Sequence, residues 1–324
     1  MNHPRLIACL ALACGMTALV FPAHAQQPYP SKPIRIVTPY PAGGSTSVYA
    51  QLIGQRLHEA WGRQVPVDNR GGGNTLIGSE HVARSAPDGY TLMVITTTHV
   101  IVTQMIKAPY DPLKDFTPIA TLGRSENILA VHKSLPVTSL KQFIAFAKPR
   151  PGQLNFGTSG SGSVTHLAIE LFQIEAGIKM QQIPYKGSGP QLTAFLGGEI
   201  EVYLNAAVNL LPLIKTDRVK ALAITGDQRY PAVPKVPTFK EAGLPGFNAK
   251  GWFGLIGPAG LPKPILDKLS QEINRALAAP EFSARMRELG TDPFINTPEQ
   301  FGELMKSDMA QYAEVIKKAN LKMN

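Results

Sequence analysis

Two patterns of apolar residues take turns along this chain. Short runs that are almost wholly apolar, at 33–39 (PIRIVTP), 90–96 (YTLMVIT) and 252–258 (WFGLIGP), predict buried β-strands. Longer stretches such as 48–61 and 164–176 carry apolar residues three or four positions apart, and they predict helices. Strands and helices that take turns along a chain are typical of an α/β fold, which is the fold class we expect.

Two of the predicted strands run into loops of glycine and hydroxyl residues. The first loop, 40–47 (YPAGGSTS), leads to helix 48–61, and the second, 157–163 (GTSGSGS), leads from strand 154–157 to helix 164–176. Glycine lets the backbone turn tightly, and free N–H groups at a helix start attract negative charge. One such loop alone is more typical of a capped turn. Two of them, each after a strand, predict opposite walls of a cleft that binds an anion.

The first 25 residues have the pattern of a cleavable export signal. A basic start is followed by the apolar run 6–21 and by Ala23-His24-Ala25, a small-x-small cleavage site. No later stretch approaches the ~20 apolar residues of a membrane span. Cys9 and Cys14 both lie in this segment, so the exported chain is expected to contain no thiol, which excludes disulfides and cysteine chemistry.

The order of the predicted elements favours two domains. Residues 26–126 and 252–324 are expected to form domain 1, and residues 127–251 to form domain 2. The chain would cross between them twice, near 123–131 and near 249–254. Two crossover segments form a hinge, and proteins with two domains joined in this way commonly close them around a ligand.

The charge and the motifs of the chain limit the ligands and reactions that we expect. The net charge of +9 is spread along the chain without a dense basic run, which suits a small anion and gives no indication of nucleic-acid binding. The Gly-x-Ser-x-Gly elbow of hydrolases fails at Ser161, and a dinucleotide fingerprint fails at Thr165. The histidines show no metal spacing, so we expect neither a metal nor a cofactor.

Two histidines leave alternatives open. His166 follows Ser163 by three residues and could serve as its base in an exported hydrolase, although a histidine at a helix start is more typically a local hydrogen-bonding group or a ligand contact. His99 follows a strand and is equally compatible with a structural role and with ligand contact.

Several short motifs, distributed over nearly the whole chain after the signal, resemble one known family. They are Tyr29-Pro-Ser-Lys-Pro33, Pro41-Ala-Gly-Gly-Ser-Thr46, Val67-Asp-Asn-Arg70, Pro87-Asp-Gly-Tyr-Thr-Leu92, Leu154-Asn-Phe-Gly157 with the loop to His166-Leu167, Pro184-Tyr-Lys-Gly187, Leu196-Gly-Gly198, Val236-Pro-Thr238 and Trp252-Phe-Gly254. In these motifs the chain resembles the Bug family, the extracytoplasmic solute receptors of tripartite tricarboxylate transporters.

The resemblance implies a two-domain type II periplasmic binding-protein fold that holds a small carboxylate in the interdomain cleft. It implies a monomeric periplasmic protein that delivers its ligand to membrane permease subunits, or a sensor that signals to a membrane kinase. The alternative from another class remains a hydrolase that uses Ser163 and His166. The residues expected around the ligand come from the two loops, from strand ends and from helix starts: Tyr40, Ala42, Gly43, Gly44, Ser45, Thr46, Ser47, Thr97, Thr98, Thr158, Ser159, Gly160, Ser161, Gly162, Ser163, His166, Gly187, Ser188 and Asn205.

Two positions depart from the family's usual pattern. Ser47 and Asn205 stand where the family commonly carries Asp. Both changes remove a negative charge that would repel an anion and pair with a ligand ammonium. These two departures therefore predict a ligand that carries a carboxylate and no amino group, such as a dicarboxylic or aromatic acid. Tyr40 and Trp252 could add ring contacts, or they could be ordinary packing residues.

Overall fold

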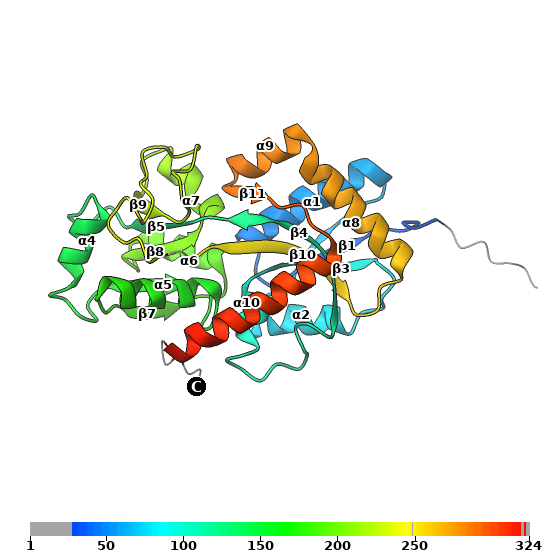
Figure 1. The fold of residues 1–324 in the computed structure, drawn as a ribbon, viewed down its shortest axis with the longest axis horizontal. Coiled ribbons are helices and arrows are strands. Elements are labelled where there is room, and N and C mark those ends of the chain that lie inside the picture. The colour runs from blue at the N-terminus through cyan, green and yellow to red at the C-terminus, as the bar shows by residue number, and fades with distance from the viewer. Residues whose placement is uncertain (1–27, 248, 319–320, 322–324) are drawn as a thin grey trace, which may run out of the picture.

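The computed structural model describes residues 28–247, 249–318 and 321, which form two α/β lobes built on separate sheets (Figure 1). We call the six-stranded sheet with its helices the first lobe, and the five-stranded sheet with its helices the second lobe. The predicted export signal, 1–25, lies outside the described residues. In the part that the structure describes, no helix has the length and apolar character needed to cross a membrane.

The first lobe has the strand order β11-β4-β10-β3-β1-β2. Its parallel part comprises β1 (Arg35–Thr38), β2 (Val67–Asn69) and β3 (Thr91–Thr96). The strand β10 (Gly251–Pro258) runs antiparallel between β3 and β4 (Phe116–Ser125), and the short β11 (Thr291–Pro293) covers β4. The start of β10 therefore lies beside the carboxyl ends of β3 and β4.

The helices of the first lobe lie on both faces of its sheet. They are α1 (Ser45–Trp61), α2 (Leu76–Ala83), α3 (Thr98–Val102), α8 (Lys263–Ala278), α9 (Pro280–Glu288) and α10 (Pro298–Lys318), with a short 3₁₀ turn at Gly73–Thr75. Neighbouring strand residues pack on opposite faces: Leu92 and Val94 lie with α1 and α8, whereas Met93 and Ile95 lie with α2 and α10. Both faces are buried, which explains why these strands are apolar throughout.

The second lobe has the strand order β7-β6-β8-β5-β9. Its strands are β5 (Asn127–Val131), β6 (Asn155–Thr158), β7 (Gln181–Pro184), β8 (Val202–Ala206) and β9 (Lys220–Ile224), and its helices are α4 (Leu140–Ala147), α5 (Val164–Ala176), α6 (Ser188–Gly197) and α7 (Ala207–Ile214). The strands β6, β7 and β8 are parallel, and β5 is antiparallel to β8 and β9. The expected α/β class is confirmed, and the start of β5 lies beside the end of β8.

The chain changes sheet twice, and the two crossings touch. The first crossing is one residue, Glu126, between β4 and β5. The second runs from Thr225 to Lys250. The Glu126 carboxylate accepts a hydrogen bond from the Thr225 hydroxyl and lies 3.7 Å from Lys250 Nζ, so it joins both ends of the second crossing. These changes of sheet support the predicted domain boundaries at 126 and 252, which stay predictions.

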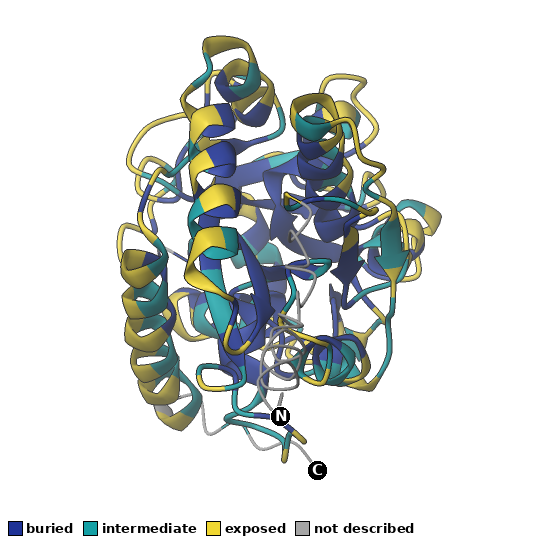
Figure 2. Cartoon of the chain, turned by 90° about the vertical axis from the view of Figure 1, so that its right-hand side faces the viewer, coloured by how far each residue is buried: buried dark blue, intermediate teal, exposed yellow. Residues whose placement is uncertain are grey.

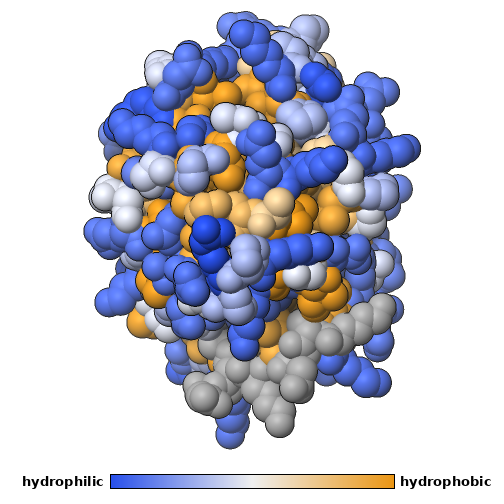
Figure 3. Space-filling view, turned by 90° about the vertical axis from the view of Figure 1, so that its left-hand side faces the viewer, coloured by the Kyte–Doolittle hydropathy of each residue, from blue (hydrophilic) through white to orange (hydrophobic). Residues whose placement is uncertain are grey.

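The strands are buried inside the molecule, and the outer faces of the helices form much of its surface. Viewed from the first-lobe end, the strands are dark blue at the centre and the outer helix faces are yellow (Figure 2). Viewed from the second-lobe end, most of the surface is hydrophilic, with apolar residues showing between the polar ones (Figure 3). Along one side α10 runs from the first lobe to α5 of the second, so the C-terminal helix spans both lobes (Figure 1).

Candidate functional site

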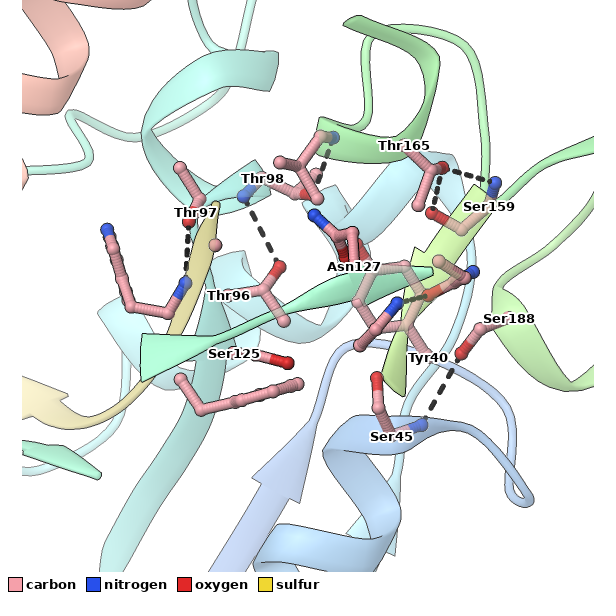
Figure 4. A pocket seen from close by; sticks show the side chains of 16 residues that line it. Tyr40, Ser45, Thr96, Thr97, Thr98, Ser125, Asn127, Ser159, Thr165 and Ser188 are labelled. Atoms are coloured by element: carbon pink, nitrogen blue, oxygen red, sulfur yellow. Dashed lines mark hydrogen bonds between the residues drawn. The ribbon is translucent and has the colours of Figure 1, made fainter. Parts of the chain in front are cut away.

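A small cavity lies between the lobes, at the edge where the strands of both sheets turn into helices. Its volume is about 40 Å³, space for roughly three water molecules. Both lobes contribute residues to its wall, as Figure 4 shows. The lining residues are Tyr40, Ser45, Thr96, Thr97, Thr98, Ser125, Asn127, Ser159, Val164, Thr165, Ser188, Asn205, Ala206, Gly251, Trp252 and Phe253.

Among the described residues, the wall of this inner cavity carries hydroxyls and amides but no formally charged side chain. Four helices of eight residues or more begin on it: α1 at Ser45, α5 at Val164, α6 at Ser188 and α7 immediately after Ala206. The N-terminal ends of helices carry partial positive charge and N–H groups without partners inside the helix. Convergence of four such ends makes the inner cavity a place where a carboxylate is stabilised without Lys or Arg.

Hydroxyls of one lobe accept hydrogen bonds from helix starts of the other. Ser45 N donates to Ser188 Oγ at 3.4 Å, and Val164 N donates to Thr98 Oγ1 at 3.1 Å (Figure 4). Each acceptor oxygen lies where an N–H group at a helix start directs its hydrogen bond. A ligand oxygen in the inner cavity would compete for the same donors.

Close backbone approach explains two of the predicted glycines. A Cβ on Gly44 would lie 2.8 Å from Ser188 Oγ, and Gly187, at φ +109°, packs against the ring of Tyr40. Larger residues at either position would separate the lobes or strain the backbone. These glycines let the cleft close and do not line it.

The amide of Asn205 belongs to a buried chain of hydrogen bonds. Its Nδ2 donates to Gln191 Oε1 at 2.8 Å, and Gln191 Nε2 donates to Gly157 O at 2.8 Å. Asn205 Oδ1 accepts from Ala206 N at 2.8 Å. This chain connects the inner cavity wall to β6, and both of its side chains are neutral amides.

Of the expected site residues, seven line the inner cavity: Tyr40, Ser45, Thr97, Thr98, Ser159, Ser188 and Asn205. Gly160 and Ser161 instead line a second space beside it, the outer cavity, of about 470 Å³. The others line neither cavity: Ala42, Gly43, Gly44, Thr46, Ser47, Thr158, Gly162, Ser163, His166 and Gly187. Trp252, left open between a ring contact and packing, does line the inner cavity.

Several of the residues outside the lining have other partners. Ser47 Oγ donates to Asn69 Oδ1 at 2.7 Å, and Thr158 Oγ1 accepts from Gln182 Nε2 at 3.0 Å. Ser163 caps α5 by accepting from His166 N at 3.3 Å. We assign these residues to the support of the cavity wall.

Ser163 and His166 do not form a nucleophile–base pair. His166 Nδ1 accepts from Gly162 N at 3.0 Å, and its Nε2 lies 3.7 Å from Glu170 Oε1. The His166 ring therefore accepts a hydrogen bond from the loop and faces Glu170. The Ser163 hydroxyl accepts a hydrogen bond from the backbone N–H of His166 and not from its ring. The hydrolase alternative is not favoured by this geometry.

Sequence reasoning missed the wall residues at the crossings and strand ends. Ser125 and Asn127 flank the first crossing, and Gly251 begins β10. The available signal was Asn127, a buried amide in an otherwise apolar strand, which needs partners. Its Nδ2 donates to Ala249 O at 2.6 Å, which ties the two crossings together.

Both buried histidines are held neutral. Burial lowers the pKa of His166, and of His99, to about 4. His99 lines neither the inner nor the outer cavity: its Nε2 lies 3.1 Å from Pro112 O, and its ring packs on Phe116. The structural role of His99 is therefore the one that the fold supports.

These two histidines predict acid sensitivity of the fold. The unfolded chain takes up these protons near the ordinary pKa of 6.5, and the folded protein does so only near 4. Their contribution to stability is complete above pH 6.5 and falls as the pH drops toward 4, by about 1–3 kcal/mol each. Urea unfolding from pH 7 to 4 would measure this loss.

Matched variants isolate the two histidines. His99→Gln and His166→Asn keep a hydrogen-bonding group without a titrating ring, so the pH dependence between 6.5 and 4 should become shallower with each change. Gln51 is exposed on α1 and carries no titrating group, so Gln51→Ala should leave that dependence as in the parent. An unchanged slope in both buried-site variants would contradict the assignment.

In the described residues, no group of three His, Cys, Asp or Glu side chains is placed to hold a metal ion. The inner cavity is suited to bind an anion through dipoles and hydroxyls. Its described lining residues include no general base paired with a nucleophile.

Comparison with known proteins identifies the family. The model of the tripartite tricarboxylate transporter family receptor matches residues 49–321. Protein BugT of Bordetella pertussis is 33% identical over 326 residues, covering 100% of both chains. Two solved structures are similar throughout. Rpa4515 of R. palustris with adipate is 33% identical, with a TM-score of 0.88, over 91% of this chain and 99% of that one. MatC of Rhodopseudomonas palustris with bound malate is 31% identical, with a TM-score of 0.83, over 89% of this chain and 100% of that one.

These likenesses extend over both lobes, and the two-lobed architecture is the fold of periplasmic binding proteins of known structure. The family resemblance inferred from the motifs is confirmed. This chain belongs to the receptor family of the tripartite tricarboxylate transporters.

Proposed function

We propose that this protein is a periplasmic receptor that binds a small carboxylate in the inner cavity and delivers it to a membrane permease. The observation that carries the proposal is the meeting of four helix starts on a hydroxyl-lined wall between two lobes. The relatives solved with adipate and with malate support a carboxylate ligand. The family supports periplasmic location, for which residues 1–25 would serve as the export signal.

The ligand class follows from the charges around the inner cavity. In the part of the chain that the structure describes, no acidic side chain lines the cavity, and Asn205 is a neutral amide whose oxygen accepts a hydrogen bond from Ala206 N. A ligand ammonium would have no carboxylate partner there, and burying it unpaired is costly. The proposed ligand therefore carries a carboxylate and no amino group.

Matched acids test this proposal. A thermal-shift screen of carboxylates comes first, because a ligand that binds only the folded protein raises its melting temperature. Calorimetry then compares succinate with aspartate and glutarate with glutamate, pairs that differ by one amino group. We expect the acids without the amino group to bind at least tenfold more tightly. Exclusive binding of the amino acids would contradict the ligand class, and an absence of binding by any carboxylate would contradict the receptor assignment.

A further inference from the structure

We propose that the outer cavity receives the far end of the ligand and that Lys186 selects acids with a second carboxylate. This inference rests on the proposed function, since it places one carboxylate in the inner cavity. It adds a second binding region and a residue that determines specificity.

The inner cavity alone is too small for a complete dicarboxylate. Its 40 Å³ corresponds to roughly three water molecules, enough for one carboxyl group and little more. The outer cavity, at about 470 Å³, is more than ten times larger. A ligand held by its carboxylate at the helix starts must therefore extend outward or hold the lobes apart.

The two cavities adjoin each other. Tyr40 of the first lobe and Ser159 of the second line both cavities, so these two residues lie at the boundary between them. The side chain of Tyr40 projects into the region between the lobes in Figure 4. Ligand atoms that pass Tyr40 enter the outer cavity directly.

Much of the wall of the outer cavity suits an apolar spacer, beside the polar side chains of Asn74, Thr75, Ser159 and Ser161. Gly71, Gly72 and Gly73 present bare backbone on the first-lobe side, together with Pro39 and Pro41. Tyr185 adds a ring from the second lobe. Such walls accept a chain of methylene groups, whose burial contributes about 0.8 kcal/mol per CH₂.

Lys186 is the one charged side chain that lines the outer cavity among the described residues, and no acidic side chain lines either cavity. Lys186 is exposed and takes part in none of the ion pairs formed within the described ranges. It directly precedes Gly187 and Ser188, so it is fixed to the start of α6, which also faces the inner cavity. An ammonium at this position favours a second negative charge on the ligand.

The test compares dicarboxylates with monocarboxylates of equal carbon number, from succinate and butyrate to pimelate and heptanoate. In Lys186→Met the dicarboxylate that binds the parent best should lose about three- to tenfold in affinity, while its matched monocarboxylate is unchanged. Lys186→Arg should retain the preference, and the exposed Lys240→Met, which lines neither cavity, should behave as the parent. Raising the salt concentration should reduce the difference between parent and Lys186→Met.

Each other outcome has a definite meaning. An equal loss for both members of a pair, or no loss for either, would overturn the role of Lys186 while leaving carboxylate binding intact. A parent protein that prefers monocarboxylates would overturn the second carboxylate site. If the parent binds no acid in the series, the proposed function fails and this inference fails with it.

Discussion

Asn205→Asp should weaken carboxylate binding about 100-fold. The substitution keeps the shape of the side chain and adds a negative charge to a wall whose described residues include no cation. Two like charges about 5 Å apart repel by roughly 3 kcal/mol at the effective dielectric constant of such sites. The new carboxylate would also face Gln191 Oε1, now the acceptor of the Asn205 amide at 2.8 Å. Calorimetry at neutral pH measures the change.

Asn205→Ala is the control for this prediction. It removes the same hydrogen bonds without adding charge, so it should lower affinity far less than Asp does. Amino acids should lose the least affinity in the Asn205→Asp variant, because their ammonium group gains a carboxylate partner. Tight binding of simple carboxylates by a folded Asn205→Asp protein would show that the anion does not lie beside this residue.

Phe301→Ala should destabilise the protein by about 3–5 kcal/mol. The Phe301 ring is fully buried, lies over Gly254 and meets the ring of Trp252 edge-on at 5.3 Å. Its removal leaves a cavity between α10 and β10, the strand whose first residues line the inner cavity. Urea unfolding, with the change in midpoint converted to free energy, gives the cost.

Glu303→Ala provides the matched comparison on the same helix. The Glu303 side chain is 77% exposed, so its loss should change the free energy of unfolding by no more than about 0.5 kcal/mol. Similar small effects from both substitutions would contradict the docking of α10 through Phe301.

The strand–loop–helix pattern located the cleft from sequence because parallel strands end at one edge of their sheet. Ser45 and Ser159, predicted from the two loops, do line the inner cavity. Other residues of the two loops lie outside the wall of the inner cavity. The helix α1 begins at Ser45 and not at residue 48, so Thr46 and Ser47 follow the helical turn away from the cavity.

Other features depend on contacts between distant parts of the chain. The crossing was predicted within a broad segment near 123–131, but the structure reduces it to Glu126 between two separate strands. The glycine-rich segment 71–74 lines part of the outer cavity, which its composition alone does not indicate. Its Asn74, at φ 55°, donates to Ser161 O across the cleft. No local pattern reports such a contact, because it exists only when the lobes meet.

We expect the ligand to bind between the lobes, and Trp252 offers a direct test. The chain has two tryptophans, and only Trp252 lines the inner cavity, while Trp61 packs on Tyr29 in the first lobe. In Trp61→Phe, the fluorescence of Trp252 followed during titration with the best-binding carboxylate should change saturably, with the dissociation constant found by calorimetry. Calorimetric binding with no change in Trp252 emission at saturation would place the ligand elsewhere and contradict the account.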